Sequence, residues 1–254
     1  MATYKRRGHK PNTQKEKEAQ IEDNSTTAEV FNTLDEGAHK TEAWLEKNQK
    51  KILGVIGAVA VVVLAVLLYQ NFVHAPKEKD AMNDMFQAQL YFEKAVDGED
   101  AEENYNLALN GGDGKFGFLD IIQNYKSTKA GNLANYYAGM SYLHTKDYKN
   151  AITYLDKFKS KDELLAPLAT GAIGDAFVQL DQYKEALDYY EKAANMRENE
   201  VTTPIYLLKA GTIALELDKA SLAKKYLEKL TEQYPNTEEA NKALTYLGTA
   251  QALN

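Results

Sequence analysis

Residues 148–155 read YKNAITYL, and residues 183–190 read YKEALDYY. Each stretch has alanine at its fourth position and an aromatic or leucine residue three and four places later. A more divergent copy, SLAKKYL, occupies residues 221–227. Apolar residues spaced by three and four positions are typical of the buried face of an α-helix. Each stretch therefore predicts a helix that packs against a neighbouring element.

A glycine lies twelve residues before the alanine of each copy, within an earlier apolar segment. The glycines are 35 and then 37 residues apart, and the alanines are separated by the same two intervals. Because two independent landmarks shift together, the pattern indicates repeated helical hairpins. We expect these small residues where the two helices of a hairpin cross closely. The landmarks are Gly139, Gly174 and Gly211, with Ala151, Ala186 and Ala223.

A period of about 34 residues is that of tetratricopeptide repeat (TPR) hairpins. The segments DYKNAITYLDKF, QYKEALDYYEKA and YPNTEEANKAL resemble TPR second helices and a turn between repeats. One such hairpin cannot bury its apolar face alone, so several hairpins stack into an α-solenoid. We therefore predict an all-α fold, with TPR-like repeats over residues 131–254 that end in a capping helix.

The apolar spacing continues less regularly over residues 77–130, for which we predict one or two divergent hairpins close to a membrane. The sequence NGGDGKFG at residues 110–117 lies within this region. It lacks the spacing of a phosphate-binding loop and the ligand pattern of an EF-hand. Clustered glycines interrupt helices, so we expect a flexible turn there.

Residues 52–69 read ILGVIGAVAVVVLAVLLY, without a charge or a proline. As a helix this stretch is about 27 Å long, close to the thickness of a bilayer's hydrocarbon core. A buried core helix or a cleaved signal peptide would compete with a membrane span. A core helix seldom stays apolar on every face, and a signal peptide seldom has fifty-one residues before its apolar stretch. We predict an uncleaved signal anchor at residues 52–72.

Four lysines lie within residues 32–51 and two within residues 73–92. Positively charged flanks stay in the cytoplasm, which places the N-terminus there. We therefore predict a single-pass membrane protein whose TPR domain lies on the side of the membrane opposite to the cytoplasm.

The segment before the anchor has two parts. Residues 1–25 are polar, and we expect a disordered cytoplasmic tail. Residues 26–50 have apolar residues at three- and four-residue intervals, which predicts an amphipathic helix next to the membrane. Either the lipid surface or a protein partner could bind this helix, and its mixed charges leave both open.

Composition restricts the chemistry. The chain has no cysteine, and residues 73–254 have twenty basic and twenty-eight acidic side chains. An acidic domain is unsuited to nucleic acid, whose phosphates attract basic surfaces. No pair of histidines has metal-ligand spacing, and no serine lies in a nucleophile motif. We expect no enzyme activity and no cofactor, although an enzyme with an unrecognised site is the alternative of a different class.

The first helix of each TPR hairpin usually lines the concave, partner-binding face. Counting from the glycine landmarks predicts an apolar and aromatic groove that could bind a partner helix or an unfolded segment. The competing interpretation is that these side chains pack against the next hairpin. The candidate groove residues are Leu133, Tyr136, Met140, Leu143, His144, Leu168, Asp175, Val178, Ile205, Leu208, Thr212 and Leu215.

The layout, a cytoplasmic tail, one anchor and divergent helices that lead through IIQNYKSTKAGNLANYYAG into TPR repeats, resembles the YfgM-like membrane-anchored TPR proteins. The resemblance implies an ancillary subunit of the Sec translocon in the bacterial inner membrane, with its TPR domain in the periplasm. Its partners would be translocon subunits, a periplasmic chaperone and unfolded clients. The alternative is a TPR scaffold of another cell-envelope assembly or division complex.

Overall fold

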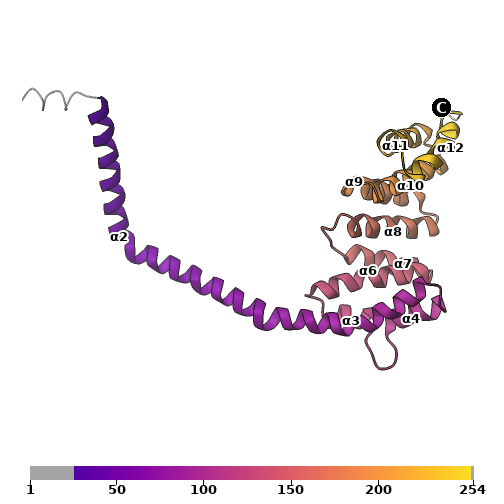
Figure 1. Cartoon of the computed structure of the whole chain (residues 1–254), viewed down its shortest axis with the longest axis horizontal. Helices are drawn as coiled ribbons and strands as arrows, with labels where there is room; N and C mark the ends of the chain where they lie inside the picture. The colour runs from indigo at the N-terminus through magenta and orange to yellow at the C-terminus, as the bar shows by residue number, and fades with distance from the viewer. Residues whose placement is uncertain (1–25, 253–254) are drawn as a thin grey trace, which may run out of the picture. The chain divides into compact units, whose positions relative to one another are not determined.

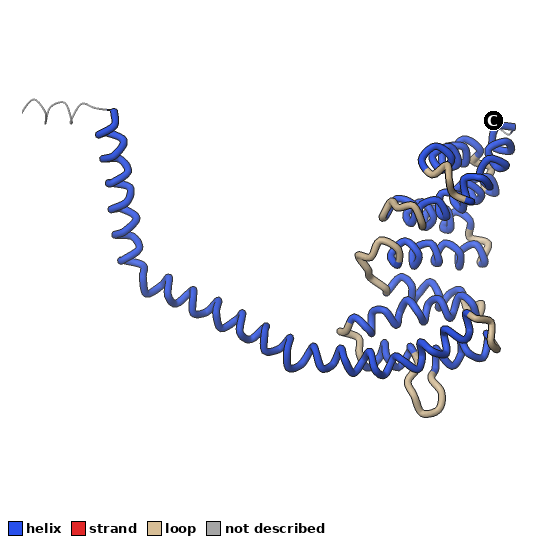
Figure 2. The backbone as a smooth tube through the Cα atoms, in the orientation of Figure 1, coloured by secondary structure: helices blue, strands red, loops and turns tan. Residues whose placement is uncertain are grey.

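The computed structural model describes residues 26–252, which form helices and turns without a β-strand (Figures 1 and 2). This confirms the all-α prediction. The described residues form two compact units, one ending at Tyr69 and one beginning at Gln70. The disorder predicted for residues 1–25 lies outside the described part.

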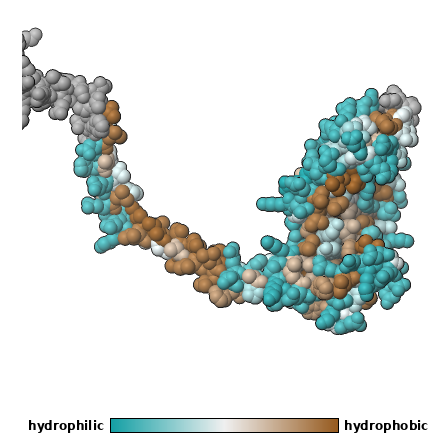
Figure 3. Space-filling model, in the orientation of Figure 1, coloured by the Kyte–Doolittle hydropathy of each residue, from teal (hydrophilic) through white to brown (hydrophobic). Residues whose placement is uncertain are grey.

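The first unit consists of the α-helix α2 (Thr26–Tyr69). The helix continues without a break between the predicted amphipathic segment and the predicted anchor. Side chains of its apolar stretch are exposed, as Leu53, Leu64 and Leu68 illustrate, and Figure 3 shows this stretch as continuous apolar surface. Among the described residues, one helical stretch is long and apolar enough to cross a membrane, and residues 52–69 are its apolar part.

The second unit starts with a divergent group of helices. The π-helical turn η1 (Gln70–His74) leads into α3 (Ala75–Val96), which α4 (Ala101–Asn110) and α5 (Phe118–Asn124) follow. Met85 of α3 and Phe118 and Ile121 of α5 are fully buried in one core. Burial of these side chains removes apolar surface from water, which is the main force that holds the group together.

Three helical hairpins follow. They are α6 (Lys129–His144) with α7 (Tyr148–Lys157), α8 (Leu165–Gln179) with α9 (Tyr183–Met196), and α10 (Thr202–Glu216) with α11 (Ala220–Gln233). The helix α12 (Glu238–Ala252) packs against α10 and α11. Figure 1 shows the hairpins stacked in chain order, as the solenoid prediction requires.

The hairpins share one turn geometry. Lys146, Asp181 and Asp218 have left-handed backbone conformations, with φ of 64°, 57° and 57°. After each of them, the next backbone N–H donates to a carbonyl near the end of the first helix. Such a left-handed residue at a helix end satisfies carbonyls that would otherwise have no partner. These turn residues recur at the same 35- and 37-residue intervals as the glycines.

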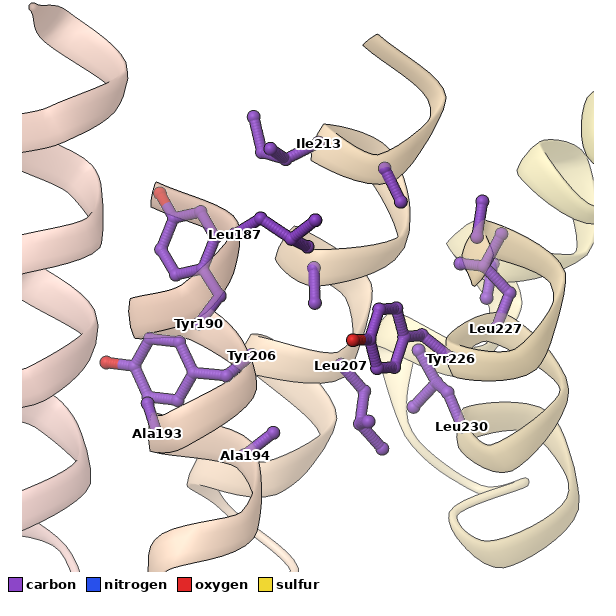
Figure 4. Packing of buried hydrophobic residues seen from close by; sticks show 14 of the residues in the cluster. Leu187, Tyr190, Ala193, Ala194, Tyr206, Leu207, Ile213, Tyr226, Leu227 and Leu230 are labelled. Atoms are coloured by element: carbon purple, nitrogen blue, oxygen red, sulfur yellow. The ribbon is translucent and has the colours of Figure 1, made fainter. Parts of the chain in front are cut away.

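The landmark glycines lie where the helices of a hairpin cross. A Cβ added to Gly139 would lie 2.5 Å from Leu155 Cγ, and one on Gly211 would lie 2.6 Å from Leu227 Cδ2. The landmark alanines have no exposed surface. This confirms that small residues permit the close crossings. Figure 4 shows the resulting core, in which Leu207, Leu227 and Leu230 fill the space between α10 and α11.

The glycine-rich stretch forms the predicted turn between α4 and α5. Gly111 adopts a φ of 82°, and an added Cβ would lie 2.2 Å from Lys115 O. The Tyr91 hydroxyl of α3 donates to Asp113 Oδ2 at 3.1 Å. Glycine is therefore required at position 111, both for its backbone conformation and for its close contact with the returning chain.

Candidate protein-interaction face

The first helices of the three hairpins carry the candidate groove. We call the surface of α6, α8 and α10 the helix-A face; α8 contacts both of its neighbours. His144 is exposed and the eleven other predicted residues are half-buried. Figure 3 shows apolar surface gathered along the solenoid between polar margins. The predicted residues therefore retain accessible surface.

Most of these side chains are nevertheless partly used within the fold. Residues of α6 pack against the core that α7 and α8 form. Residues of α8 and α10 pack against the core of the last hairpins. The Thr212 hydroxyl donates to Lys209 O at 2.9 Å in its own helix. The exposed atoms of these side chains could thus contact a partner, as the groove interpretation states. Their buried atoms pack against neighbouring hairpins, as the competing interpretation states. The packed residues are Leu133, Tyr136, Met140 and Leu143 in the first group, and Val178, Ile205, Leu208 and Leu215 in the second.

A polar cluster lies at the centre of the helix-A face. Lys209 Nζ of α10 lies 2.6 Å from Asp175 Oδ1 of α8, and the Tyr190 hydroxyl of α9 donates to the same oxygen at 2.5 Å. The side chains of Asp175 and Lys209 are 34% and 37% exposed, whereas Tyr190 is only 3% exposed. The buried Tyr190 therefore holds the Asp175 carboxylate through a hydrogen bond, and the carboxylate remains partly accessible to solvent.

The tyrosines around this cluster are neutral. Burial is the main cause that raises the pKa of Tyr190, and the nearby Asp175 charge and hydrogen bond raise it further. Burial and the same carboxylate raise the pKa of Tyr206. Lys209 Nζ lies 5.5 Å from the centre of the Tyr190 ring and 5.8 Å from that of Tyr206, within the range of cation–π attraction.

Gly171 makes room for this arrangement. A Cβ on Gly171 would lie 1.9 Å from Tyr206 Cε1, so the ring of α10 lies directly against the backbone of α8. The Tyr206 ring also lies 6.2 Å from the Tyr190 ring, centre to centre, and Figure 4 shows both hydroxyls on the side of α8. The glycine thereby brings α8 and α10 close enough for the ion pair.

A cavity of about 330 Å³ opens next to the cluster. Four predicted residues, Leu143, His144, Asp175 and Val178, share its lining. The others that line it are Lys146, Tyr148, Gln179 and Tyr190. This lining combines two aliphatic and two tyrosine side chains with polar groups that include Asp175 and Lys146. Such a cavity could hold a side chain of a partner and orient it through a polar contact.

His144 borders a second cavity, of about 460 Å³, near α4. Its ring stacks on Tyr105 with centres 4.8 Å apart. The residue keeps exposed surface, but the partial burial of its ring lowers its pKa. The neutral imidazole is thus favoured, and its ring extends the aromatic lining from α6 to α4.

Sequence reasoning missed Lys209 and Tyr190. A signal was available, because Asp175 is the only charged residue of α8 and Lys209 is the only charge in α10 before Glu216. Opposite charges isolated in two apolar helices of adjacent repeats suggest a pair. The Tyr190 contribution depends on the crossing of α8 and α9, which the spacing alone does not specify.

The side chains of this site provide apolar contacts, hydrogen bonds and an ion pair. Among residues 26–252, no group of three His, Asp or Glu side chains is placed to hold a metal ion. The helix-A face offers apolar and aromatic surface and one partly exposed ion pair with a cavity beside it, and the second cavity adjoins the face at His144. Such a surface is suited to side chains of a protein segment.

A comparison with curated proteins found no match. A comparison with protein families matched residues 81–246, more than half of the 254 residues, to the family described as T7SS, ESX-1 secretion system protein EccA1, N-terminal domain. This is a TPR-like protein-interaction domain of a secretion system. The resemblance to YfgM-like Sec subunits was wrong, because it was based on the layout and on residues common to TPR hairpins in general. The match begins at Ala81 within α3 and includes the divergent helices together with the three hairpins, and on this ground the chain belongs to the EccA1 N-terminal domain family.

Proposed function

We propose that this protein is a membrane-anchored TPR-like adaptor of a cell-envelope protein-secretion complex, and that it binds an apolar segment of a protein partner on its helix-A face. The observation that carries the proposal is the cavity shared by Leu143, His144, Asp175 and Val178 beside the Asp175–Lys209 ion pair. The family match supports a role in protein interaction within a secretion system.

The partner segment has a defined chemistry. Apolar side chains would contact the half-buried residues of α6, α8 and α10, because a TPR face of this kind binds a helix or an extended chain. The partly exposed Asp175 would accept a hydrogen bond from the segment. Burial of the segment's apolar side chains would supply most of the affinity, and the carboxylate would supply register.

The proposed anchor is the apolar stretch of α2. Its side chains lie outside the protein's own core, which favours lipid over a buried core helix as their surroundings. The excess of lysine before the stretch favours a cytoplasmic N-terminus and a helix-A face on the opposite side of the membrane. The protein would act by binding rather than by catalysis.

The test compares variants of the full-length protein purified from its native membrane in mild detergent. The double variant Val178→Asp/Leu208→Asp puts two charges on the helix-A face. The control, Val201→Asp, places one charge on a residue that is 58% exposed at the start of α10, outside the predicted face. We expect the double variant to lose envelope-protein partners that the wild type and the control retain. Equal recovery of partners by all three proteins would contradict the proposal.

A further inference from the structure

A cavity of about 260 Å³ lies between α7, α8 and α9, and we call it the α7–α9 cavity. Ala166, Ala169 and Ile173 of α8 line it, whereas Asp175 and Val178 of α8 line the cavity of the helix-A face. Successive residues of an α-helix are about 100° apart, so Ile173 and Asp175 point to nearly opposite sides of α8. The α7–α9 cavity is therefore separate from the site of the proposed function.

Small side chains of α8 border the α7–α9 cavity. Ala169 and Thr170 line it and are buried. The interval of 37 residues between the second and third repeats relates them to Tyr206 and Leu207 of α10, which are large and also buried. Alanine and threonine occupy less volume than tyrosine and leucine, and the cavity lies against them.

Apolar side chains of the neighbouring helices complete the lining. Leu155 of α7 and Phe158 just after it are buried, and Tyr189 of α9 is half-buried. Met196 at the end of α9 also lines the cavity, and its Sδ accepts a hydrogen bond from the Thr170 hydroxyl at 3.8 Å. Methionine is flexible and can adapt to an occupant. The interior of the α7–α9 cavity is thus suited to an apolar side chain.

Hydrogen-bond donors predominate among the polar groups at the opening of the cavity. Lys159 and Lys192 are exposed there, and among the residues that the structure describes neither lysine forms an ion pair. Lys159 Nζ donates to the backbone carbonyl of Asp156 at 2.6 Å, and Lys192 Nζ lies 5.6 Å from the centre of the Tyr189 ring. Ser160 Oγ accepts a backbone N–H at 3.0 Å, and its hydroxyl can still donate its own proton.

The charge at this opening differs from that of the domain around it. Asp156 is the only acidic residue that lines the cavity, against the two lysines. Residues 73–254 as a whole have twenty basic and twenty-eight acidic side chains. The opening therefore attracts a carboxylate, although the domain has an excess of negative charge.

We propose that the α7–α9 cavity is a second binding site, which takes a leucine- or phenylalanine-sized side chain of an acidic segment of a protein partner. The apolar side chain would fill the cavity, and an adjacent Asp or Glu would pair with Lys159 or Lys192. A basic segment would be repelled by both lysines, so charge complementarity selects the acidic one. The volume lies below the roughly 300–1,000 Å³ of pockets that hold whole small ligands, which favours a single side chain.

The experiment uses fluorescein-labelled peptides of eight residues, whose binding to the full-length protein in mild detergent is measured by fluorescence anisotropy. A central Leu, Phe or Ala is flanked by two acidic, two basic or two neutral residues. The variant Lys159→Glu/Lys192→Glu reverses both charges at the opening. The matched control, Lys149→Glu/Lys184→Glu, reverses two exposed lysines of α7 and α9 that lie outside the cavity.

We expect the wild type to bind the acidic Leu or Phe peptides at least ten-fold more tightly than the basic peptides and the acidic Ala peptide. Lys159→Glu/Lys192→Glu should reverse the preference for flanking charge, and the control should keep it. Absence of binding, binding without these preferences, or an equal change in both double variants would overturn the proposal.

The helix-A face is tested separately with the same peptides. Val178→Asp/Leu208→Asp alters that face and leaves the lining of the α7–α9 cavity unchanged. We expect this variant to bind the acidic peptides as the wild type does. Loss of their binding would place the peptides on the helix-A face and contradict a second site, whatever the outcome for the proposed function.

Discussion

At the scale of single residues, space and charge decide how α8 and α10 meet. Gly171 admits the Tyr206 ring, and the ring's position allows Lys209 to reach Asp175. Together, the two contacts shape the centre of the helix-A face.

Gly171→Ala tests the steric part. In most helices alanine is more stabilising than glycine by about 0.5–1 kcal/mol. Here the added Cβ would overlap the Tyr206 ring, so we expect a net loss of about 1–3 kcal/mol in the free energy of unfolding. Urea unfolding of the full-length protein, followed by circular dichroism, measures the change. In a Tyr206→Leu background the same substitution should cost much less, and an equal cost in both backgrounds would contradict the contact.

Tyr125 and Asp84 provide a pH prediction. The Tyr125 hydroxyl donates to Asp84 Oδ2 at 2.5 Å, and this hydrogen bond is the main cause that raises the pKa of Tyr125 to about 12. Because the folded pKa exceeds that of an unfolded tyrosine, about 10, the contact contributes stability below pH 10. That contribution is lost as the pH rises from 10 through 12.

Titration of ¹³C-labelled tyrosine by NMR measures this pKa, with Tyr125→Phe used to assign the signal. Asp84→Asn removes the negative charge and should lower the pKa of Tyr125 towards 10. An unchanged titration in Asp84→Asn would show that the carboxylate is not the cause.

At the scale of helices, contacts between elements hold the divergent helices to the first hairpin. Glu78 of α3 accepts hydrogen bonds from the backbone N–H groups of Lys129 and Ala130, at 2.7 and 2.9 Å. These groups belong to the first turn of α6, where backbone donors lack partners within the helix. A carboxylate there also interacts favourably with the helix dipole.

Glu78→Ala should therefore destabilise the start of α6 by about 1 kcal/mol. Hydrogen exchange of the Lys129 and Ala130 amides should become several-fold faster, whereas Glu93→Ala, at an exposed position of the same α3, should leave both amides unchanged. Unaltered exchange in Glu78→Ala would mean that α6 does not depend on this cap.

Helices and repeat spacing could be predicted from the sequence because Gly139, Gly174 and Gly211 have close packing partners at a constant distance along the chain. The Glu78 cap joins residues more than fifty positions apart, and no local pattern encodes it. The Asp175–Lys209 pair could be predicted in part, because opposite charges isolated in two apolar helices suggest an ion pair. The wrong family resemblance arose because TPR residues specify how hairpins stack, whereas partners are selected by surface residues that differ between families.

At the scale of the whole molecule, the proposed anchor and its orientation are open to direct measurement. Single cysteines at Glu46 and Glu185 would lie on opposite sides of a membrane that residues 52–69 span. In intact cells, a membrane-impermeant maleimide supplied on the side of the membrane opposite to the cytoplasm should label Glu185→Cys and spare Glu46→Cys until the membrane is broken. Labelling of both residues in intact cells would contradict the anchor, and the reverse pattern would invert the orientation.

The helix-A face is tested most directly by photo-crosslinking in the native membrane. A photoreactive amino acid replaces Tyr136, Val178 or Leu208 on the helix-A face, or the exposed Glu185 or Lys225 on the second helices α9 and α11. If the face binds a protein segment, the first three positions should form the same crosslinked product and the other two should not. Crosslinks of equal yield at all five positions, or only at Glu185 and Lys225, would contradict a partner on the helix-A face.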